Sequence, residues 1–129
     1  MNLIDSSVWI DYFNGTDTRA TELLDEMLGK QPIATGDLIV TEVLQGFRSD
    51  KDFDQAKVLL STLHFYTIGG WEVALQSAAN YRVLRRKGIT IRKTIDVFIA
   101  TFCIIHNIPL LHFDKDFEPL VTHLGLKVL

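Results

Sequence analysis

Cysteine is almost absent from this chain of 129 residues, since Cys103 is the single one. A disulfide needs two cysteines, so an internal disulfide framework is excluded, and we expect a protein of a reducing compartment, by default the cytoplasm. Proline and glycine are also few, at 3 and 8 residues, while hydrophobic residues make up 47%. This composition excludes a disordered or fibrous chain and favours one globular domain over residues 1–129.

Long apolar runs and an excess of positive charge are missing as well. The longest apolar run, residues 97–105, is interrupted by Thr101 and falls well short of the roughly 20 residues that span a bilayer. The first ten residues contain Asp5 and no basic leader, so we expect no secretory signal. The 13 Lys and Arg against 16 Asp and Glu give a net charge of −3, which argues against a strongly basic nucleic-acid binder.

Short apolar segments alternate with amphipathic ones along the chain. Strands are predicted at residues 2–5, 32–34, 64–68, 108–111 and 126–128, and helices near residues 8–13, 19–28, 37–47, 53–63, 71–87, 95–106 and 117–124. The longest helix carries a stripe of Trp71, Ala74, Leu75, Ala78 and Tyr81. Strands that alternate with helices predict an α/β fold with a parallel sheet covered on both faces.

Several acidic residues lie where predicted strands end or helices begin. Asp5 closes the first strand, Asp96 opens the helix of residues 95–106, and Asp114 and Asp116 follow the strand of residues 108–111. The carboxyl ends of parallel strands share one edge of the sheet, so these side chains are expected to meet there. Glu42, in the helix after the second strand, could join them. Taken singly, Asp96, Asp114 and Asp116 fit helix caps and Glu42 fits a solvated helix face. Asp5 is harder to explain in this way, since Ser6 or Ser7 could cap the following helix.

Converging carboxylates require compensation, because two such charges 4 Å apart repel by roughly 4 kcal/mol at an effective dielectric near 20. Either a carboxylate takes up a proton or a hard cation such as Mg²⁺ or Mn²⁺ binds between them. A cation there favours metal-assisted phosphodiester hydrolysis. Other chemistries have less support, because Cys103 fits a buried apolar helix, the four histidines lack zinc-ligand spacing, and no P-loop is present.

Four segments carry a resemblance to a known family. They are residues 3–10 (LIDSSVWI), 41–46 (TEVLQG), 94–100 (TIDVFIA) and 110–117 (LLHFDKDF). Together they resemble the PIN-domain nucleases, and among them the VapC-type toxins of bacterial type II toxin–antitoxin systems. The resemblance runs nearly end to end. It implies a PIN-like three-layer sandwich whose parallel sheet has four or five strands in the order 3-2-1-4-5, flanked by helices.

The resemblance also implies an activity and a set of site residues. The implied activity is that of an endoribonuclease that depends on Mg²⁺ or Mn²⁺ and cleaves structured RNA such as tRNA, leaving a 5′-phosphate. The implied catalytic residues are Asp5, Glu42, Asp96 and Asp114, and the implied metal ligands are Asp5, Asp96 and Asp114. Asp116 could share or take the role of Asp114. Ser7 and Thr94 resemble hydroxyl positions that orient water or an acidic ligand.

A basic stretch without any acidic residue leads from Gln76 to Ile95. Its six cations are Arg82, Arg85, Arg86, Lys87, Arg92 and Lys93. Cations are favoured at the end of a helix, which is one explanation. The position of the stretch next to Asp96 favours another, in which these side chains bind RNA phosphates and steer RNA to the site.

An apolar set on the first and third predicted helices has two explanations. Its members are Trp9, Tyr12, Phe13, Leu44 and Phe47. Stripes at helical spacing usually face the core. The resemblance adds a groove that receives a helix of a cognate VapB-like antitoxin, and it also implies a homodimer.

Two other readings of the chain stay open. One is a catalytically silent PIN-like domain that only binds RNA or protein, although retention of all four acidic positions argues against it. The other is a phospho-receiver domain, which has a similar length and acidic residues around Mg²⁺. That domain needs an aspartate at the end of the third strand, where this chain has Gly69 and Gly70, and Lys115 matches its lysine only loosely.

Overall fold

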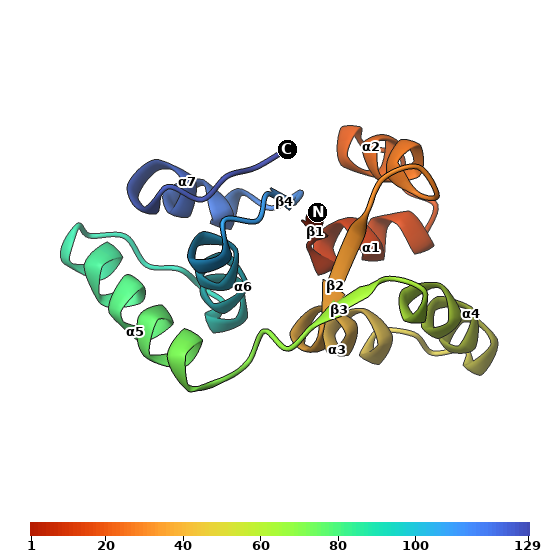
Figure 1. The fold of residues 1–129 in the computed structure, drawn as a ribbon, viewed down its shortest axis with the longest axis horizontal. Helices are drawn as coiled ribbons and strands as arrows, with labels where there is room; N and C mark the ends of the chain where they lie inside the picture. The colour runs from red at the N-terminus through yellow and green to blue at the C-terminus, as the bar shows by residue number, and fades with distance from the viewer.

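A parallel sheet of four strands forms the centre of the computed structural model, which describes residues 1–129 (Figure 1). The strands are β1 (Asn2–Ile4), β2 (Ile33–Gly36), β3 (His64–Tyr66) and β4 (Leu110–Leu111), in the order β3-β2-β1-β4. Leu3 pairs with Ala34 on one side and with Leu110 on the other. The predicted α/β class and strand order are confirmed. The expected fifth strand is reduced to a single parallel bridge between Leu110 and Val128.

Seven α-helices and one short 3-10 helix surround the sheet. They are α1 (Ser6–Phe13), α2 (Arg19–Met27), α3 (Asp37–Gln45), α4 (Asp50–Ser61), α5 (Trp71–Arg86), α6 (Thr94–His106), η1 (Lys115–Phe117) and α7 (Glu118–Leu124). In Figure 1, α5, α6 and α7 lie on the side of β4, while α3 and α4 lie on the side of β3. None of the helices is both long and apolar enough to cross a membrane. The cytoplasmic location stays a prediction.

The central strand β1 is buried from Leu3 onwards, which explains why its residues read as an unbroken apolar run. Leu110 and Leu111 of β4 are also fully buried, and Trp9 and Phe117 are the largest side chains without any exposure. Strands buried on both faces have a fixed register, because a slip of one residue would move every side chain to the opposite face. The carboxyl ends of β1 and β4 are therefore held side by side.

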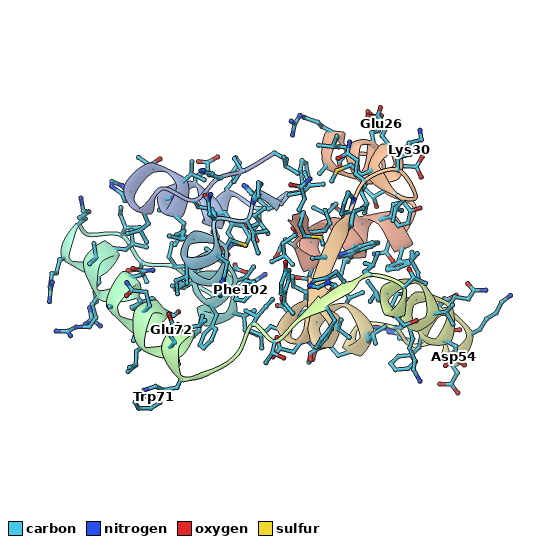
Figure 2. The ribbon with its side chains drawn as sticks, in the orientation of Figure 1. Glu26, Lys30, Asp54, Trp71, Glu72 and Phe102 are labelled. Carbon is cyan, nitrogen blue, oxygen red and sulfur yellow. The ribbon has the colours of Figure 1, made fainter.

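The apolar stripe of α5 does not face the core, contrary to the usual inward orientation of such stripes. Trp71 is 80% exposed and Leu75 is 53% exposed, and Trp71 projects away from the ribbon (Figure 2). The helix instead turns its buried residues, which include Ser77 and Asn80, towards α6. There the side-chain amide of Asn80 donates a hydrogen bond to Thr101 Oγ1 over 3.0 Å. The buried face of α5 thus combines the apolar Val73 and Leu84 with polar side chains, of which Asn80 is hydrogen-bonded to α6.

The junction between β2 and α3 positions the helix that carries Glu42. Asp37, at the start of α3, accepts a hydrogen bond from the amide of Ile68 through Oδ1 (2.8 Å) and from the amide of Gly69 through Oδ2 (3.3 Å). Ile68 is fully buried and packs directly on Gly36, where a Cβ atom would lie 2.4 Å from Ile68 Cδ1 and 3.0 Å from the Tyr66 carbonyl oxygen. The close approach requires glycine at this position.

We expect Gly36→Ala to lower the free energy of unfolding by about 1–3 kcal/mol, because the added methyl group overpacks the contact with Ile68. Urea unfolding followed by circular dichroism measures the change. Gly46→Ala is the matched control, since the nearest atom to its added Cβ is 3.6 Å away, and it should change stability by less than about 0.5 kcal/mol. Equal stability of both variants would contradict the tight packing at Gly36.

Candidate active site

Four acidic side chains converge where the parallel strands end. Asp5 directly follows β1 and caps α1, Asp114 follows β4 and caps η1, and Asp96 lies in the first turn of α6. Glu42 reaches the same place from α3. Like Asp5 and Asp114, it lies close enough to Asp96 to raise the pKa of that carboxyl by electrostatic repulsion. The structure therefore brings together the four residues that the sequence singled out.

Asp5 is buried and held in one orientation by Ser7. Its Oδ2 atom accepts hydrogen bonds from the Ser7 amide (3.0 Å) and from the Ser7 hydroxyl (2.6 Å). The same hydroxyl oxygen accepts a bond from the amide of Phe113 (3.2 Å), which ties the end of β1 to the loop after β4. Burial raises the pKa of Asp5, and the bonds from Ser7 oppose this rise. Its Oδ1 atom is buried and has no hydrogen-bond partner.

Glu42 is held by a residue that the sequence did not single out. The hydroxyl of Ser6 donates a hydrogen bond to Glu42 Oε1 over 2.9 Å, across 36 positions of the chain. Partial burial raises the pKa of Glu42, as does repulsion by Asp5, while Ser6 and Lys93 lower it. No local pattern could indicate this contact, because it depends on where α3 lies relative to α1. Adjacent serines thus orient two different carboxylates.

Asp96 lies at the centre of the acidic group. It is only 4% exposed, and its Oδ2 atom has no hydrogen-bond partner. Burial is the main reason why its pKa is raised to about 7, and repulsion by Asp5, Asp114 and Glu42 adds to it, while Lys93 opposes the rise. Near neutral pH this carboxyl therefore exchanges readily between its protonated and charged forms.

Asp114 and Asp116 lie on the open side of the group. Asp114 Oδ1 accepts a hydrogen bond from the amide of Asp116 over 2.9 Å. Oxygens of Asp96, Asp114 and Asp116 all lie within 4.8 Å of one another. Arg92 donates to Asp116 Oδ2 through both Nε and Nη2 at 3.2 Å, and Lys93 Nζ lies 4.0 Å from Asp114 Oδ2. Both aspartates of the segment thus belong to the group.

The side chains present fit a divalent cation. Buried carboxylate oxygens normally have hydrogen-bond partners, yet Asp5 Oδ1 and Asp96 Oδ2 have none. Magnesium and manganese prefer oxygen ligands, and a cation bound among these carboxylates would relieve the repulsion that helps to raise the pKa of Asp96. Asp96 and Asp114 are predicted metal ligands together with Asp5. In the structure the same two residues lie close to Asp116.

The six cations of the basic stretch divide into two groups. Arg92 and Lys93 turn to the carboxylates, as described above. The remaining four, Arg82, Arg85, Arg86 and Lys87, are exposed at the end of α5 or just after it. Thr94 is exposed at the first residue of α6, two positions before Asp96. Only four of the six cations are therefore free of the acidic group.

The apolar set of α1 and α3 contributes partly to the core. Trp9 is fully buried and stacks on Phe13 with ring centroids 5.8 Å apart, so the expectation that Trp9 binds a partner is wrong. Phe13 also meets Phe47 edge to face at 5.7 Å. Phe13, Phe47, Tyr12 and Leu44 are partly buried and retain exposed surface. A groove for a partner stays a prediction for these four.

Cys103 has the environment expected of a structural residue. It is buried in α6, and burial raises the pKa of its thiol to about 12. A thiol in this state is not a nucleophile at neutral pH. Cys103 is therefore unsuited to act as a nucleophile.

Together, the sheet order and the converging carboxylates define an α/β domain with an acidic site at the strand ends. The model of the PIN domain matches residues 3–120, and the chain belongs to the PIN-domain family. Ribonuclease VapC11 of Mycobacterium tuberculosis is 31% identical over 120 residues, which cover 92% of this chain and 90% of that protein. Membership of this family excludes the phospho-receiver reading.

Solved structures have the same fold. VapBC2 from Rickettsia felis, bound to a DNA fragment from the promoter, matches with a TM-score of 0.76 at 16% identity, covering 99% of this chain and 96% of the other. VapBC-5 from Mycobacterium tuberculosis, a member of the VapBC family of toxin-antitoxin systems, matches with a TM-score of 0.65 at 19% identity, covering 99% and 96%. The likeness extends over the whole sheet and its helices.

We expect Asp96→Asn to stabilise the metal-free protein above neutral pH. The ordinary pKa of the carboxyl is 3.8 and the folded value is about 7, so the folded state binds this proton more tightly than the unfolded chain does. Wild-type stability therefore falls as the pH rises between these values, and the variant lacks that part of the fall. Near pH 8 the variant should be more stable by roughly 1–3 kcal/mol.

Urea unfolding in the presence of a chelator, repeated across this pH range, measures the difference. Asp54→Asn, on the exposed face of α4 (Figure 2), is the control and should follow the wild type. A variant at Asp96 that is less stable than the wild type at high pH would show that the carboxylate stabilises the fold, contrary to its unpartnered burial.

Proposed function

We propose that the protein is a metal-dependent endoribonuclease of the VapC type that hydrolyses phosphodiester bonds in structured RNA such as tRNA. One observation carries the proposal: carboxylates from four separate elements converge, and two of their buried oxygens, Asp5 Oδ1 and Asp96 Oδ2, lack partners. The relationship to a protein named ribonuclease supports the same activity.

The residues have distinct roles in this proposal. Asp5, Asp96 and Asp114 hold Mg²⁺ or Mn²⁺, with Asp116 completing or replacing the contribution of Asp114. When bound, the cation supplies a Lewis acid that polarises the phosphoryl group and makes water a better nucleophile. Ser7 positions Asp5.

Glu42 has the role of a proton acceptor. Ser6 occupies its Oε1 atom, which leaves Oε2 to take a proton from water. Its raised pKa suits a group that accepts a proton near neutral pH. Thr94, exposed at the start of α6, has a hydroxyl that can orient water. No protein side chain needs to form a covalent bond with RNA.

Cleavage of total RNA with Mg²⁺ or Mn²⁺, repeated with a chelator, tests the activity. Asp5→Asn and Asp96→Asn should each slow cleavage by more than the roughly 10- to 100-fold typical for loss of a residue that only orients a metal ligand. Asp54→Asn should retain the wild-type rate. Because Asp96→Asn is expected to be at least as stable as the wild type, its loss of activity would not reflect unfolding.

An inert wild-type protein, separated from any bound partner, would overturn the nuclease proposal and favour the catalytically silent alternative. Cleavage that persists in the chelator, or in both variants, would overturn the metal-dependent mechanism instead.

A protein partner is part of the proposal. Structures with the same fold include a VapBC toxin-antitoxin system, which supports a VapB-like antitoxin for this chain. A second copy of the chain, as a homodimer partner, is proposed from the family resemblance alone. Tyr12, Phe13, Leu44 and Phe47 present partly exposed apolar surface between α1 and the end of α3. A helix of the antitoxin would bind there through its apolar face.

Affinity capture with the tagged protein in its native host tests the partner. We expect a small protein to be captured by the wild type and lost with Phe47→Lys, because the charge would face the apolar groove. Phe65→Lys is the control, since Phe65 is 56% exposed on β3, away from this groove. The partner assignment fails if no small protein is recovered, or if both variants capture it equally.

A further inference from the structure

A hollow between α5 and α6 lies outside the acidic group, and of its lining residues only Thr94 has a role in the hydrolysis proposed above. It encloses about 410 Å³, and its lining includes Tyr81, Arg82 and Arg85 of α5 with Thr94 and Phe98 of α6. We propose that this hollow receives one unpaired nucleobase of the RNA substrate, next to the cleaved phosphate. The inference rests on the proposed function only in taking RNA as the substrate.

The hollow and the acidic group share the first turn of α6. Thr94 and Phe98 lie four positions apart on one face of the helix and line the hollow. Asp96, in the same turn, lies on the opposite side of the helix, because residues two positions apart are turned by about 200°. The two sites meet around the start of α6, where Lys93 Nζ lies 4.0 Å from Asp114 Oδ2 and the next residue, Thr94, lines the hollow. A strand of RNA that crosses the first turn of α6 can therefore reach both sites.

The lining combines aromatic rings with guanidinium groups. Arg85 lies over the ring of Tyr81, with Cζ 5.9 Å from the ring centroid, and Phe98 is partly exposed across the hollow. Single-stranded RNA is bound in this way, with bases stacked on aromatic side chains or on guanidinium planes. A flat base can therefore bind between the ring of Tyr81 on α5 and the ring of Phe98 on α6.

The charge of the hollow complements a nucleotide. Its lining contains two arginines and no acidic residue. The two ion pairs of the structure use Arg92 and Lys93, so Arg82 and Arg85 are exposed and available to phosphates on either side of the base. Phosphate contacts of this kind position the strand without reading its sequence.

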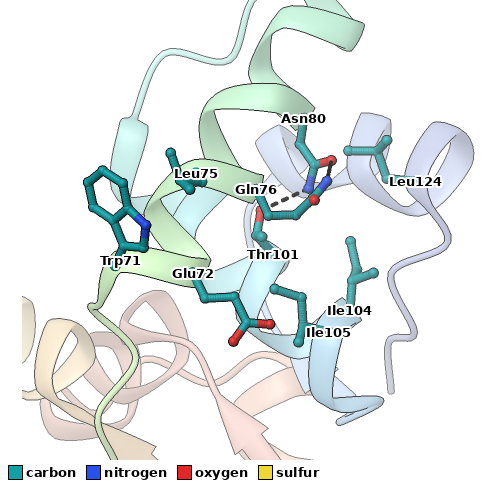
Figure 3. Close-up of a pocket in the computed structure, with 9 residues that line it drawn as sticks. All are labelled: Trp71, Glu72, Leu75, Gln76, Asn80, Thr101, Ile104, Ile105 and Leu124. Carbon is teal, nitrogen blue, oxygen red and sulfur yellow. Dashed lines mark hydrogen bonds between the residues drawn. The ribbon is translucent and has the colours of Figure 1, made fainter.

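A second hollow at the opposite end of the same two helices has a different character (Figure 3). It includes Trp71 and Glu72 and contains no lysine or arginine. The polar side chains that line it already form hydrogen bonds with one another. Gln76 donates to Asn80 and Asn80 donates to Thr101, each over 3.0 Å. The glutamate would repel a phosphate, so of these two hollows the one at Tyr81 suits RNA better.

The substrate must therefore be unpaired at the nucleotide that enters the hollow. A base inside a duplex is stacked and paired and cannot enter a space between two helices without leaving the stack. Loops, bulges and single strands fit this requirement, and regular duplex does not.

Binding measurements test the proposal separately from cleavage. All proteins carry Asp96→Asn, which removes one negative charge from the acidic group. All are kept in a chelator, which prevents metal-dependent cleavage. The probe is a short fluorescein-labelled oligoribonucleotide of mixed sequence, free or annealed to its complement, with affinity read from fluorescence anisotropy. We expect Tyr81→Leu to weaken binding of the single strand by about 5- to 150-fold, the range of one base stacked on an aromatic ring.

Three further variants separate stacking from charge and from folding. Tyr81→Phe keeps the ring and should retain the affinity. Trp71→Leu removes an aromatic ring that is 80% exposed at the far end of α5 and should have no effect. Arg85→Gln should reduce the salt dependence of single-strand binding by a slope of about 0.7, the share of one phosphate contact, whereas Tyr81→Leu should leave that slope unchanged.

Equal affinity of wild type and Tyr81→Leu for the single strand would overturn the proposal, as would equal loss with Trp71→Leu. Duplex that binds as tightly as the single strand would overturn it too. Loss of the captured small protein with Tyr81→Leu, at unchanged RNA affinity, would assign the hollow to a protein partner instead. Binding of single strands that depends on Tyr81, together with a wild-type protein that cleaves no RNA in Mg²⁺ or Mn²⁺, would support the hollow and overturn only the nuclease proposal.

Discussion

Repulsion between buried carboxylates is the constraint around which this structure is organised. Asp5 and Asp96 are almost fully buried, and both have pKa values raised by loss of solvent. A fold that brings such groups together sacrifices stability in the metal-free state, because each charge is kept out of water and near another of the same sign. The parallel sheet makes this arrangement possible, since residues 3–4 and 110–111 are clamped at the centre of the core.

Much of the fold follows from the chain's own pattern. The unbroken apolar run of β1 indicates a strand buried on both faces, and Ser6 and Ser7 after Asp5 indicate the turn into a helix. Parallel strands with helical connections can be arranged in only a few ways. The acidic edge of the sheet could therefore be predicted from the sequence positions of Asp5, Asp96 and Asp114. The strand order itself came from the family resemblance. The strand predicted at residues 126–128 does not form, because this segment makes only one bridge to the sheet, between Leu110 and Val128.

The parts that could not be predicted depend on contacts between distant elements. The bond from Ser6 to Glu42 requires α1 and α3 to pack side by side, and nothing local in either helix reports it. In α5 the large apolar side chains of Trp71 and Leu75 are exposed, whereas a face that carries the polar Ser77 and Asn80 beside Val73 and Leu84 is buried. The amide of Asn80 has a partner there in Thr101, so burial of that polar face is compensated by hydrogen bonding. Hydrophobic periodicity cannot detect such a match.

The net charge of −3 shows why a sum over the chain says little about its ligands. Arg92 and Lys93 counted as part of a basic stretch, but in the fold they lie against Asp116 and Asp114 and offset negative charge locally. Arg82 and Arg85, from the same stretch, face the hollow between α5 and α6 instead. One run of sequence therefore contributes to two electrostatic environments, the acidic group and the hollow, on different sides of α6. A polyanion such as RNA is attracted by the positive charge at the hollow and repelled by the carboxylates of the acidic group. Its approach is therefore favoured on the side of Tyr81.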